Sequence, residues 1–268
     1  MIPTISNIAW PMADDMAAEA ALHELGVSSL ELAPTRHWPD LSMVTEAAAR
    51  DLSESLLARG FRIAGFQAVL FGQPSLQVFG VDGGRACRDY LISVCRLAGW
   101  MGAGAVVLGA PKNRLRGGLA PEAAHALARD FFREVGAAAD AVGTRICLEP
   151  NPAAYGADFL LTAAEAADLV QAVDSPGVAL NFDMGEQALH EADAAANILV
   201  LAPLIGHFHV SEPMLEPFDP ARAAHAEAAA ALRRVGYAGA VSLEMKPPTG
   251  GIPSLRAALA GMKEIYEL

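Results

Sequence analysis

Short apolar runs suited to β-strands recur eight times along the 268-residue chain, and stretches with helical periodicity separate them. This alternation is typical of an α/β protein in which a crossover helix follows each parallel strand. Eight such units predict a (β/α)8 barrel of the TIM-barrel type, with a doubly wound open sheet as the competing fold. The first run is followed by WPMADD instead of a glycine-rich phosphate loop, which weighs against the open sheet. The expected strands are residues 4–10, 27–33, 62–69, 105–109, 145–149, 178–183, 205–211 and 240–245.

The segments between these runs carry signals for the ends of helices. Pro121 followed by Glu122 predicts one helix start, and Thr162 followed by Glu165 predicts a capping box. No linker, low-complexity segment or charge run marks a second domain, so residues 1–268 are expected to form a single domain. The clearest expected helices are residues 13–25, 85–100, 121–142, 162–173 and 220–235. Four glycines are expected to end helices, namely Gly26, Gly60, Gly143 and Gly236.

Composition and charge narrow the class of binding partner. The chain is 53% hydrophobic and 19% charged, in agreement with strands that are buried on both faces. A net charge of -12 argues against a nucleic-acid or anionic-membrane surface, because binding there needs clustered lysine and arginine. No run approaches the roughly 20 apolar residues of a membrane span, and no signal-peptide pattern opens the chain. Three cysteines without a CxxC pair indicate neither a disulfide framework nor a cysteine zinc site. We therefore expect a cytoplasmic protein that binds a small molecule.

Polar side chains occur at the ends of four consecutive expected strands. Glu149 closes the fifth in LEPNP, Asp183 the sixth in LNFD, His209 lies in HFHVSE, and Glu244 lies in SLEMKP. A single acidic residue at such a place is most often a helix cap, but independent caps would be mostly Ser, Thr, Asp and Asn. In a barrel these positions share one mouth. Two glutamates, an aspartate and a histidine there form a ligand set for one divalent metal, namely Mn²⁺, Mg²⁺, Co²⁺ or Zn²⁺.

These motifs resemble a known family along essentially the whole chain. LEPNP, NFDMG, HFHVSEP and SLEMK are similar to motifs of the xylose isomerase-like barrels, a family of sugar phosphate isomerases and epimerases that includes the ketose 3-epimerases. The resemblance implies that Glu149, Asp183, His209 and Glu244 bind one metal. Members of the family are often dimers or tetramers, so a homo-oligomer is one possibility, and the sequence leaves the oligomeric state open.

The chemistry of this family explains why two glutamates are needed. Isomerisation or epimerisation of a sugar removes a proton next to a carbonyl, and a metal stabilises the resulting enediolate as a Lewis acid. Epimerisation also requires an acid/base group on each face of the carbon. Glu149 and Glu244 are the candidates for these two catalytic groups. The predicted function is therefore a metal-dependent isomerase or epimerase of a sugar or sugar derivative.

The chain departs from the ketose 3-epimerase pattern at three positions that contact substrate in that family. Glu186 stands where a histidine is usual, Leu215 where an arginine is usual, and Tyr155 where a glutamate is usual, whereas Glu212 matches. These departures make a simple free ketose such as fructose or psicose an unexpected substrate. A modified or phosphorylated sugar is expected instead.

A narrower resemblance, to barrels that share SNIAW, ELAPTRHWP, FQAVLFG, GAPKNR and EPNPxxYG, adds candidate substrate-binding residues. Lys112, Arg114, Arg36 and Lys246 would form a positive region for a phosphate or carboxylate, or the arginines would be solvated loop charges. Trp10, Trp38 and Phe71 would form an apolar wall for a sugar ring or would pack under a loop. The narrower resemblance also adds His37, Trp38 and Asn113 as candidates. The predicted substrate-binding residues are Trp10, Arg36, Gln67, Lys112, Arg114, Asn151, Glu186, Glu212 and Lys246.

Two further residues and three other functions stay open. His207 shares the inward phase of His209 and is expected in the barrel interior, whereas Glu31 is an inward carboxylate with no evident partner. A lyase or dehydratase acting on a keto-sugar or inosose would use the same metal site and begin with the same proton abstraction. Phosphodiester cleavage, as in the endonuclease IV barrels, needs more metals and a basic face. A non-catalytic binding protein would leave unexplained the free-energy cost of burying these carboxylates.

Overall fold

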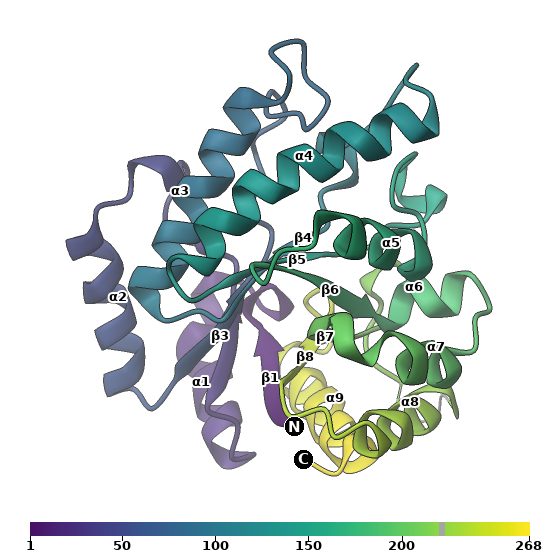
Figure 1. Cartoon of the computed structure of the whole chain (residues 1–268). Helices are drawn as coiled ribbons and strands as arrows, with labels where there is room; N and C mark the ends of the chain where they lie inside the picture. The colour runs from purple at the N-terminus through teal and green to yellow at the C-terminus, as the bar shows by residue number, and fades with distance from the viewer. Residues whose placement is uncertain (220–222) are drawn as a thin grey trace.

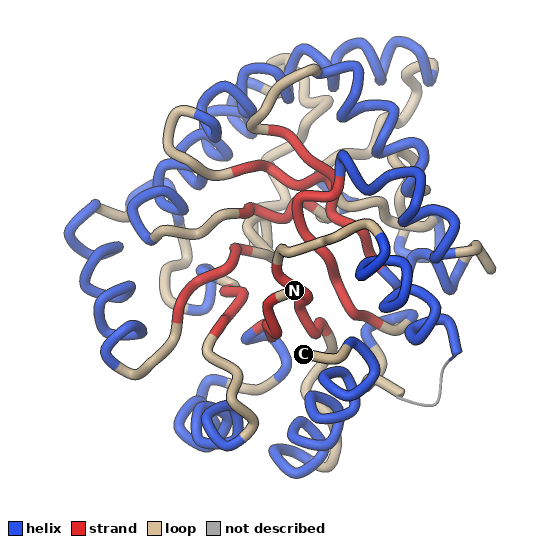
Figure 2. Tube along the Cα trace, turned by 60° about the horizontal axis from the view of Figure 1, so that its bottom comes forward, coloured by secondary structure: helices blue, strands red, loops and turns tan. Residues whose placement is uncertain are grey.

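The computed structural model describes residues 1–219 and 223–268, and its strands form one closed parallel barrel in the order β1 to β8. Figure 1 shows the helices wrapped around the strands, with both chain ends on the same side of the molecule. The tube in Figure 2 shows the strands gathered inside the ring of helices. This confirms the predicted (β/α)8 barrel. The strands are β1 (Ile2–Ser6), β2 (Ser29–Leu32), β3 (Arg62–Phe66), β4 (Ala105–Leu108), β5 (Arg145–Leu148), β6 (Val178–Asp183), β7 (Ile205–Ser211) and β8 (Ala240–Glu244).

Helices follow the strands along the chain, and most begin and end close to the expected residues. The start expected at residue 220 lies outside the described residues. The α-helices are α1 (Asp15–Glu24), α2 (Glu46–Ala58), α3 (Arg85–Met101), α4 (Pro121–Asp140), α5 (Ala163–Val173), α6 (Met184–Leu189), α7 (Ala194–Leu201), α8 (Ala223–Arg234) and α9 (Gly251–Tyr266). Short 3-10 helices lie in the loops, namely η1 (Asn7–Ala9), η2 (Met12–Asp14), η3 (Pro34–Arg36), η4 (Leu41–Met43), η5 (Pro111–Asn113), η6 (Ala153–Tyr155), η7 (Ala202–Leu204) and η8 (Pro213–Leu215).

The expected helix signals act largely as predicted. Thr162 caps α5 by accepting a hydrogen bond from the Glu165 amide at 3.2 Å, and the Glu165 carboxylate accepts one from the Leu161 amide at 2.7 Å. The four glycines expected to end helices all have positive φ values, between 67° and 89°. Two strands end earlier than expected because their chains turn. Ser6 caps η1 after β1, and Ala68 adopts φ 53° two residues beyond β3.

Two kinds of core hold the barrel together. A large apolar layer lies between strands and helices, and includes fully buried rings such as Phe66, Phe132 and Phe208. The barrel interior is filled differently. Ala105, Val107, Cys147 and Ala179 form a small apolar cluster there, whereas Thr4, Ser29, Glu31, Asn181, His207, His209 and Ser242 are buried polar residues on the strands. All three cysteines are buried and unpaired, as the sequence suggested.

Within residues 1–219 and 223–268, no helix combines the length and the apolar character that crossing a membrane requires.

The close approach of α4 to the start of β6 generates a prediction about stability. A Cβ atom at Gly177 would lie 1.9 Å from the Gly136 carbonyl oxygen and 2.8 Å from the Asp140 nitrogen, and both are backbone atoms. Gly177→Ala should therefore destabilise the fold by about 1–3 kcal/mol, measured by urea unfolding. Gly118→Ala is the matched control, because nothing lies within 4 Å of its Cβ position. Equal unfolding midpoints for the two variants would contradict this account of the packing.

Candidate metal centre

Four of the predicted residues meet at the carboxyl ends of strands β5 to β8. Glu149 directly follows β5, Asp183 ends β6, His209 lies in β7 and Glu244 ends β8. Strand register brings them level, because Asp183 pairs with His209 and Glu244 pairs with Ser211. Each residue offers one potential ligand atom, and these atoms all lie within 4.8 Å of one another. The expected convergence of these four side chains is therefore present in the structure.

The Nδ1 atom of His209 faces the three carboxylates. It lies 3.2 Å from Glu149 Oε2, 3.2 Å from Glu244 Oε2 and 3.9 Å from Asp183 Oδ2. The His209 side chain is fully buried, and the three carboxylate side chains are 10–13% exposed. Three carboxylates at this separation repel one another unless a positive charge lies between them.

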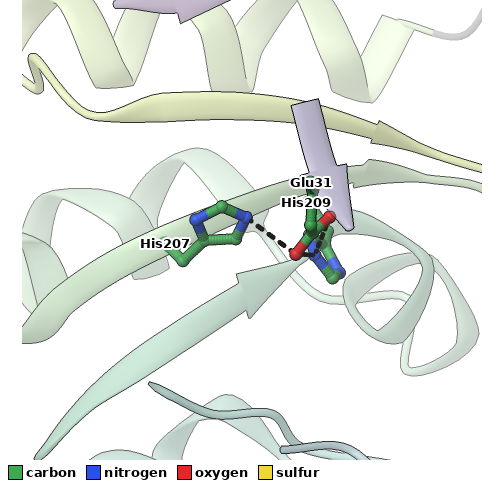
Figure 3. Close-up of side chains that lie close together, drawn as sticks. All are labelled: Glu31, His207 and His209. Carbon is green, nitrogen blue, oxygen red and sulfur yellow. Dashed lines mark hydrogen bonds and ion pairs between the residues drawn. The ribbon is translucent and has the colours of Figure 1, made fainter. Parts of the chain in front are cut away.

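Glu31, which had no partner in the sequence analysis, binds the other side of His209. Its carboxylate oxygens lie 3.0 and 3.1 Å from His209 Nε2, and its Oε1 lies 3.1 Å from His207 Nε2. Figure 3 shows the Glu31 carboxylate directed at both imidazole rings. When Nε2 of His209 carries the proton donated to Glu31, Nδ1 presents a lone pair to the carboxylate cluster. Glu31 thus orients His209 as a metal ligand would need to be oriented.

Amide groups hold Glu149 in place. Asn151 Nδ2 donates to Glu149 Oε1 at 3.0 Å, and Asn181 Nδ2 donates to Glu149 Oε2 at 2.8 Å. Arg114 donates to the Glu149 carbonyl oxygen, to Leu108 O at 3.0 Å and to Asn151 Oδ1 at 2.9 Å. The Arg114 side chain is 1% exposed, so it is neither a solvated loop charge nor part of a positive region at the mouth. Both expectations for Arg114 were wrong: it is buried, and its hydrogen bonds hold the backbone of Glu149 and the side chain of Asn151.

Asp183 has two roles that the sequence analysis treated as alternatives. Its Oδ1 caps α6 by accepting a hydrogen bond from the Glu186 amide at 2.7 Å, while its Oδ2 accepts one from Ser211 Oγ at 2.5 Å. Ser211 Oγ in turn accepts from the Gly185 amide at 2.9 Å. The cap fixes the Asp183 side chain so that Oδ2 faces His209.

Burial and mutual repulsion shift the pKa values of the cluster. Burial, with the Glu149 and Glu244 carboxylates, raises the pKa of Asp183 to about 8. Burial likewise raises the pKa of Glu244. Burial opposes ionisation of Glu149 and of Glu31, but the histidines outweigh it and lower both pKa values. Burial disfavours the charged His209 ring, yet the surrounding carboxylates, Glu31 first, raise its pKa well above the usual value.

The residues present fit a divalent cation. Three carboxylates and one correctly oriented imidazole provide the oxygen and nitrogen donors that Mn²⁺, Mg²⁺, Co²⁺ and Zn²⁺ accept. Asn181 Oδ1, beside the same cluster, is a buried oxygen with no hydrogen-bond partner among the described residues. A cation among these donors would neutralise a charge that the protein alone leaves on buried carboxylates.

A cavity of about 270 Å³ lies against the cluster. It is lined by the carboxylates of Glu149, Asp183 and Glu244, together with three of the predicted substrate-binding residues, namely Asn151, Glu212 and Lys246. Glu212 is buried, and its Oε1 lies 3.2 Å from His225 Nε2. Lys112 is exposed and lines a larger cavity next to this one. We call the 270 Å³ space the metal-side cavity.

The other predicted substrate-binding residues do not line the metal-side cavity, because they pair with protein groups. Arg36 Nη2 and Trp10 Nε1 both donate to Asp15 Oδ1 at 2.8 Å. Gln67 is buried and donates to Ser6 Oγ.

Glu186 is likewise turned toward protein groups. It is 1% exposed, it accepts a hydrogen bond from the Gln187 side chain, and its Oε1 lies 3.1 Å from His190 Nδ1. Burial raises its pKa.

Several residues that line the metal-side cavity were not among the predicted substrate-binding residues. Tyr155, Met214 and Leu215 line it, and the Met214 amide donates to the Tyr155 hydroxyl at 2.8 Å. The backbone of η8 is tightly bent, with φ 60° at Met214 and 56° at Leu215. η8 therefore forms part of the wall of the metal-side cavity. The only sequence signal was that Tyr155 and Leu215 differ from the family pattern.

The chain belongs to the xylose isomerase-like TIM barrel family, because the sequence model of that family matches residues 19–266. No curated protein matches the chain significantly.

Solved structures with the same fold include sugar epimerases. A D-psicose 3-epimerase determined in the presence of D-fructose has a TM-score of 0.81 and 19% identity, and the match covers 99% of each chain. The 3-keto-D-glucoside 4-epimerase of E. coli has a TM-score of 0.79 and 15% identity, covering 98% of this chain and 100% of that one. The IolI protein with a bound zinc atom has a TM-score of 0.72 and 14% identity, covering 99% and 96%. At such identities the likeness establishes the fold.

The position of Glu31 generates a prediction about metal affinity. Glu31→Gln keeps the shape of the side chain but removes the negative charge that orients and polarises His209. We expect divalent-metal affinity, measured by calorimetric titration with Mn²⁺, to fall about 10- to 100-fold. Glu54→Gln, an exposed position on α2, is the charge-matched control. Unchanged affinity in Glu31→Gln would show that His209 needs no such partner.

The pKa shifts predict how stabilisation by metal depends on pH. The pKa of Asp183 is about 8 in the folded protein, against about 3.9 when unfolded. The pKa values of Glu244 and His209 are also raised. Between about pH 4 and pH 8 Asp183 binds more protons when folded than when unfolded, so stability without metal falls as pH rises. Glu244 acts in the same sense above about pH 4.3, and His209 above about pH 6.5. Glu149 and Glu31 act in the opposite sense, but only near and below about pH 4.3.

A cation that replaces those protons should stabilise the protein more at higher pH. The rise in Tm on adding excess Mn²⁺ should therefore be larger at about pH 8 than at about pH 5.5. Thermal unfolding at both pH values, with and without the metal, measures it. A Tm increase that is equal at the two pH values, or larger at the lower one, would contradict the proposed exchange of protons for metal.

Proposed function

We propose that this protein is a divalent-metal-dependent isomerase or epimerase of a sugar or sugar derivative. The observation that carries the proposal is the arrangement of three carboxylates around Nδ1 of His209, whose Nε2 is held by Glu31. The family and the sugar epimerases among proteins of the same fold support this choice of chemistry. Glu149, Asp183, His209 and Glu244 would hold the metal, which when bound would act as a Lewis acid on the substrate carbonyl and the neighbouring oxygen.

Glu149 and Glu244 are the proposed acid/base pair. A carboxylate oxygen of one takes the proton from the carbon next to the carbonyl, and the other returns a proton to the same carbon or to the neighbouring one. Return to the opposite face of the same carbon gives an epimer, whereas return to the neighbouring carbon, with a shift of the carbonyl, gives an isomer. Hydrogen bonds from Asn151 and Asn181 keep the Glu149 carboxylate at a fixed position for this transfer.

Two lysines lie where they could bind a negatively charged substituent of the substrate. Lys246 lines the metal-side cavity and Lys112 lines the larger one beside it. Because Arg36 and Arg114 are occupied by protein groups, the positive region expected from the sequence reduces to these two lysines. A phosphate or carboxylate on the sugar would bind to one of them.

A dehydratase acting on a keto-sugar or inosose is the second candidate. Glu186 is turned away from the metal-side cavity and Leu215 lines it, so neither supplies the polar contact that the ketose epimerase pattern places there. Lys246 at the same cavity could protonate a departing hydroxyl group. Elimination begins with the same proton removal by a glutamate. Mass spectrometry of the product separates the two candidates, because only the dehydratase releases water.

The acid/base roles of the two glutamates can be tested by hydrogen exchange. With Mn²⁺ supplied, the wild type should exchange a carbon-bound hydrogen of a keto-sugar in a substrate panel with deuterium from solvent. Glu149→Gln and Glu244→Gln should each slow exchange about 100- to 10,000-fold, measured by mass spectrometry. Because Glu149→Gln is also expected to bind less metal, exchange is compared per bound Mn²⁺ ion in the same samples, which separates loss of the base from loss of the metal. Glu227→Gln, exposed on α8, is the control. Undiminished exchange in both cluster variants would refute the proposed roles.

A further inference from the structure

A second cavity of about 660 Å³ lies beside the metal-side cavity, between the loops that follow β3 and β4. We propose that this space, the β3–β4 cavity, binds an apolar group attached to the sugar. The substrate would then be a keto-sugar that carries an aromatic or aliphatic substituent. This inference rests on the proposed function and adds to it the class of substrate. The cavity is lined by residues 68–74 and 107–113.

The two cavities adjoin close to the proposed acid/base residue Glu149. Pro111 lines both of them. Gly109 lines the β3–β4 cavity, and a Cβ atom added there would lie 2.6 Å from Glu149 Oε1 and 3.4 Å from Asn151 Oδ1. Gly109, which lines the β3–β4 cavity, therefore lies next to the carboxylate that would move the proton, and that carboxylate lines the metal-side cavity. A sugar held at the cluster by its carbonyl end can extend into this cavity with its other end.

The wall of the β3–β4 cavity offers few polar partners to a ligand. Asn113 Nδ2 donates to Gln73 O at 2.8 Å and to Leu76 O at 2.7 Å, and Gln73 Nε2 donates to Pro39 O at 3.1 Å. These amides thus tie the loops to each other. Lys112 is the charged residue among those that line the cavity. Each sugar hydroxyl buried here without a partner would cost free energy, so the cavity favours a group that has no hydroxyls.

Apolar side chains and two hydrogen-bonded turns form the wall of the β3–β4 cavity. Val69 and Leu70 are buried, whereas the Phe71 side chain is 76% exposed, which leaves an aromatic ring without cover. Ala68 and Ala110 adopt φ 53° and 44°, a left-handed conformation that is uncommon outside glycine. Backbone hydrogen bonds of 3.0 Å close both turns, from the Phe71 amide to Ala68 and from the Asn113 amide to Ala110. The loops therefore form a fixed surface on which a flat or branched apolar group can pack.

Size also favours a substituted sugar. Sites for small organic ligands usually have volumes of roughly 300–1,000 Å³. The metal-side cavity, at about 270 Å³, lies just below this range. The adjoining β3–β4 cavity is more than twice as large, at about 660 Å³. An unsubstituted sugar would leave this larger apolar space filled with water.

Binding measurements with a matched pair of ligands test the proposal. The pair is 6-O-benzyl-D-fructose and 6-O-methyl-D-fructose, titrated by calorimetry into the protein supplied with Mn²⁺. The benzyl ether should bind about 10- to 100-fold more tightly, because its ring leaves water.

Three variants test whether the β3–β4 cavity causes this difference. Ala110→Phe fills the cavity and should bring the ratio of the two Kd values close to one. Phe71→Ser, at an exposed position that should tolerate the change, should lower the ratio about 2- to 10-fold. Ala137→Phe, exposed on α4, is the control and should keep the wild-type ratio.

The outcomes separate this inference from the proposed function. A ratio near one in the wild type, no binding of either ether, or a ratio unchanged in both Ala110→Phe and Phe71→Ser would overturn the apolar subsite. Deuterium exchange is measured on the same samples. Exchange of both ethers without a difference in affinity would leave the sugar chemistry standing and remove the subsite. A clear difference in affinity without exchange would support the subsite and contradict the isomerase.

Discussion

Buried negative charge around one histidine is the constraint on which the rest of the site depends. Glu149, Asp183 and Glu244 surround one ring nitrogen of His209, and Glu31 binds the other. Carboxylates withdrawn from water in this number need compensation, either by protons or by a cation. The raised pKa values of Asp183 and Glu244 show that protons compensate the charge when no metal is bound. A bound divalent metal would compensate it instead. The groups around the cluster hold the four side chains in an arrangement that a divalent metal could bind.

The barrel supplies that geometry through strand register. Adjacent parallel strands place Asp183 level with His209, and Ser211 level with Glu244. Asn181 on β6 donates to the Glu149 carboxylate, and Arg114, in the loop after β4, donates to the Glu149 carbonyl oxygen. The loops after β3 and β4 enclose the neighbouring β3–β4 cavity. One edge of the barrel thus combines a rigid ionic site with an apolar space, a combination suited to a substrate that has two chemically different ends.

Periodicity predicted the fold and the four central residues because both depend on local pattern. Alternating runs specify strands, and strand ends in a barrel meet at one mouth, so Glu149, Asp183, His209 and Glu244 could be grouped from their places in the sequence. The loop residues could not be placed in this way, because periodicity does not set the direction of a loop side chain. Arg114 turns inward to three backbone and amide oxygens, and Arg36 pairs with Asp15, 21 residues away. Glu31 found its partners on β7, which only the closed barrel brings close.

The central claim is that the cluster around His209 holds one divalent metal. The most direct measurement is elemental analysis of the protein purified without chelator and then supplied with Mn²⁺, beside Glu149→Gln and Asp183→Asn. The account predicts about one divalent ion per chain in the wild type and a large loss in both variants. A wild type that binds no divalent metal even when it is supplied, or variants that bind as much as the wild type, would contradict it.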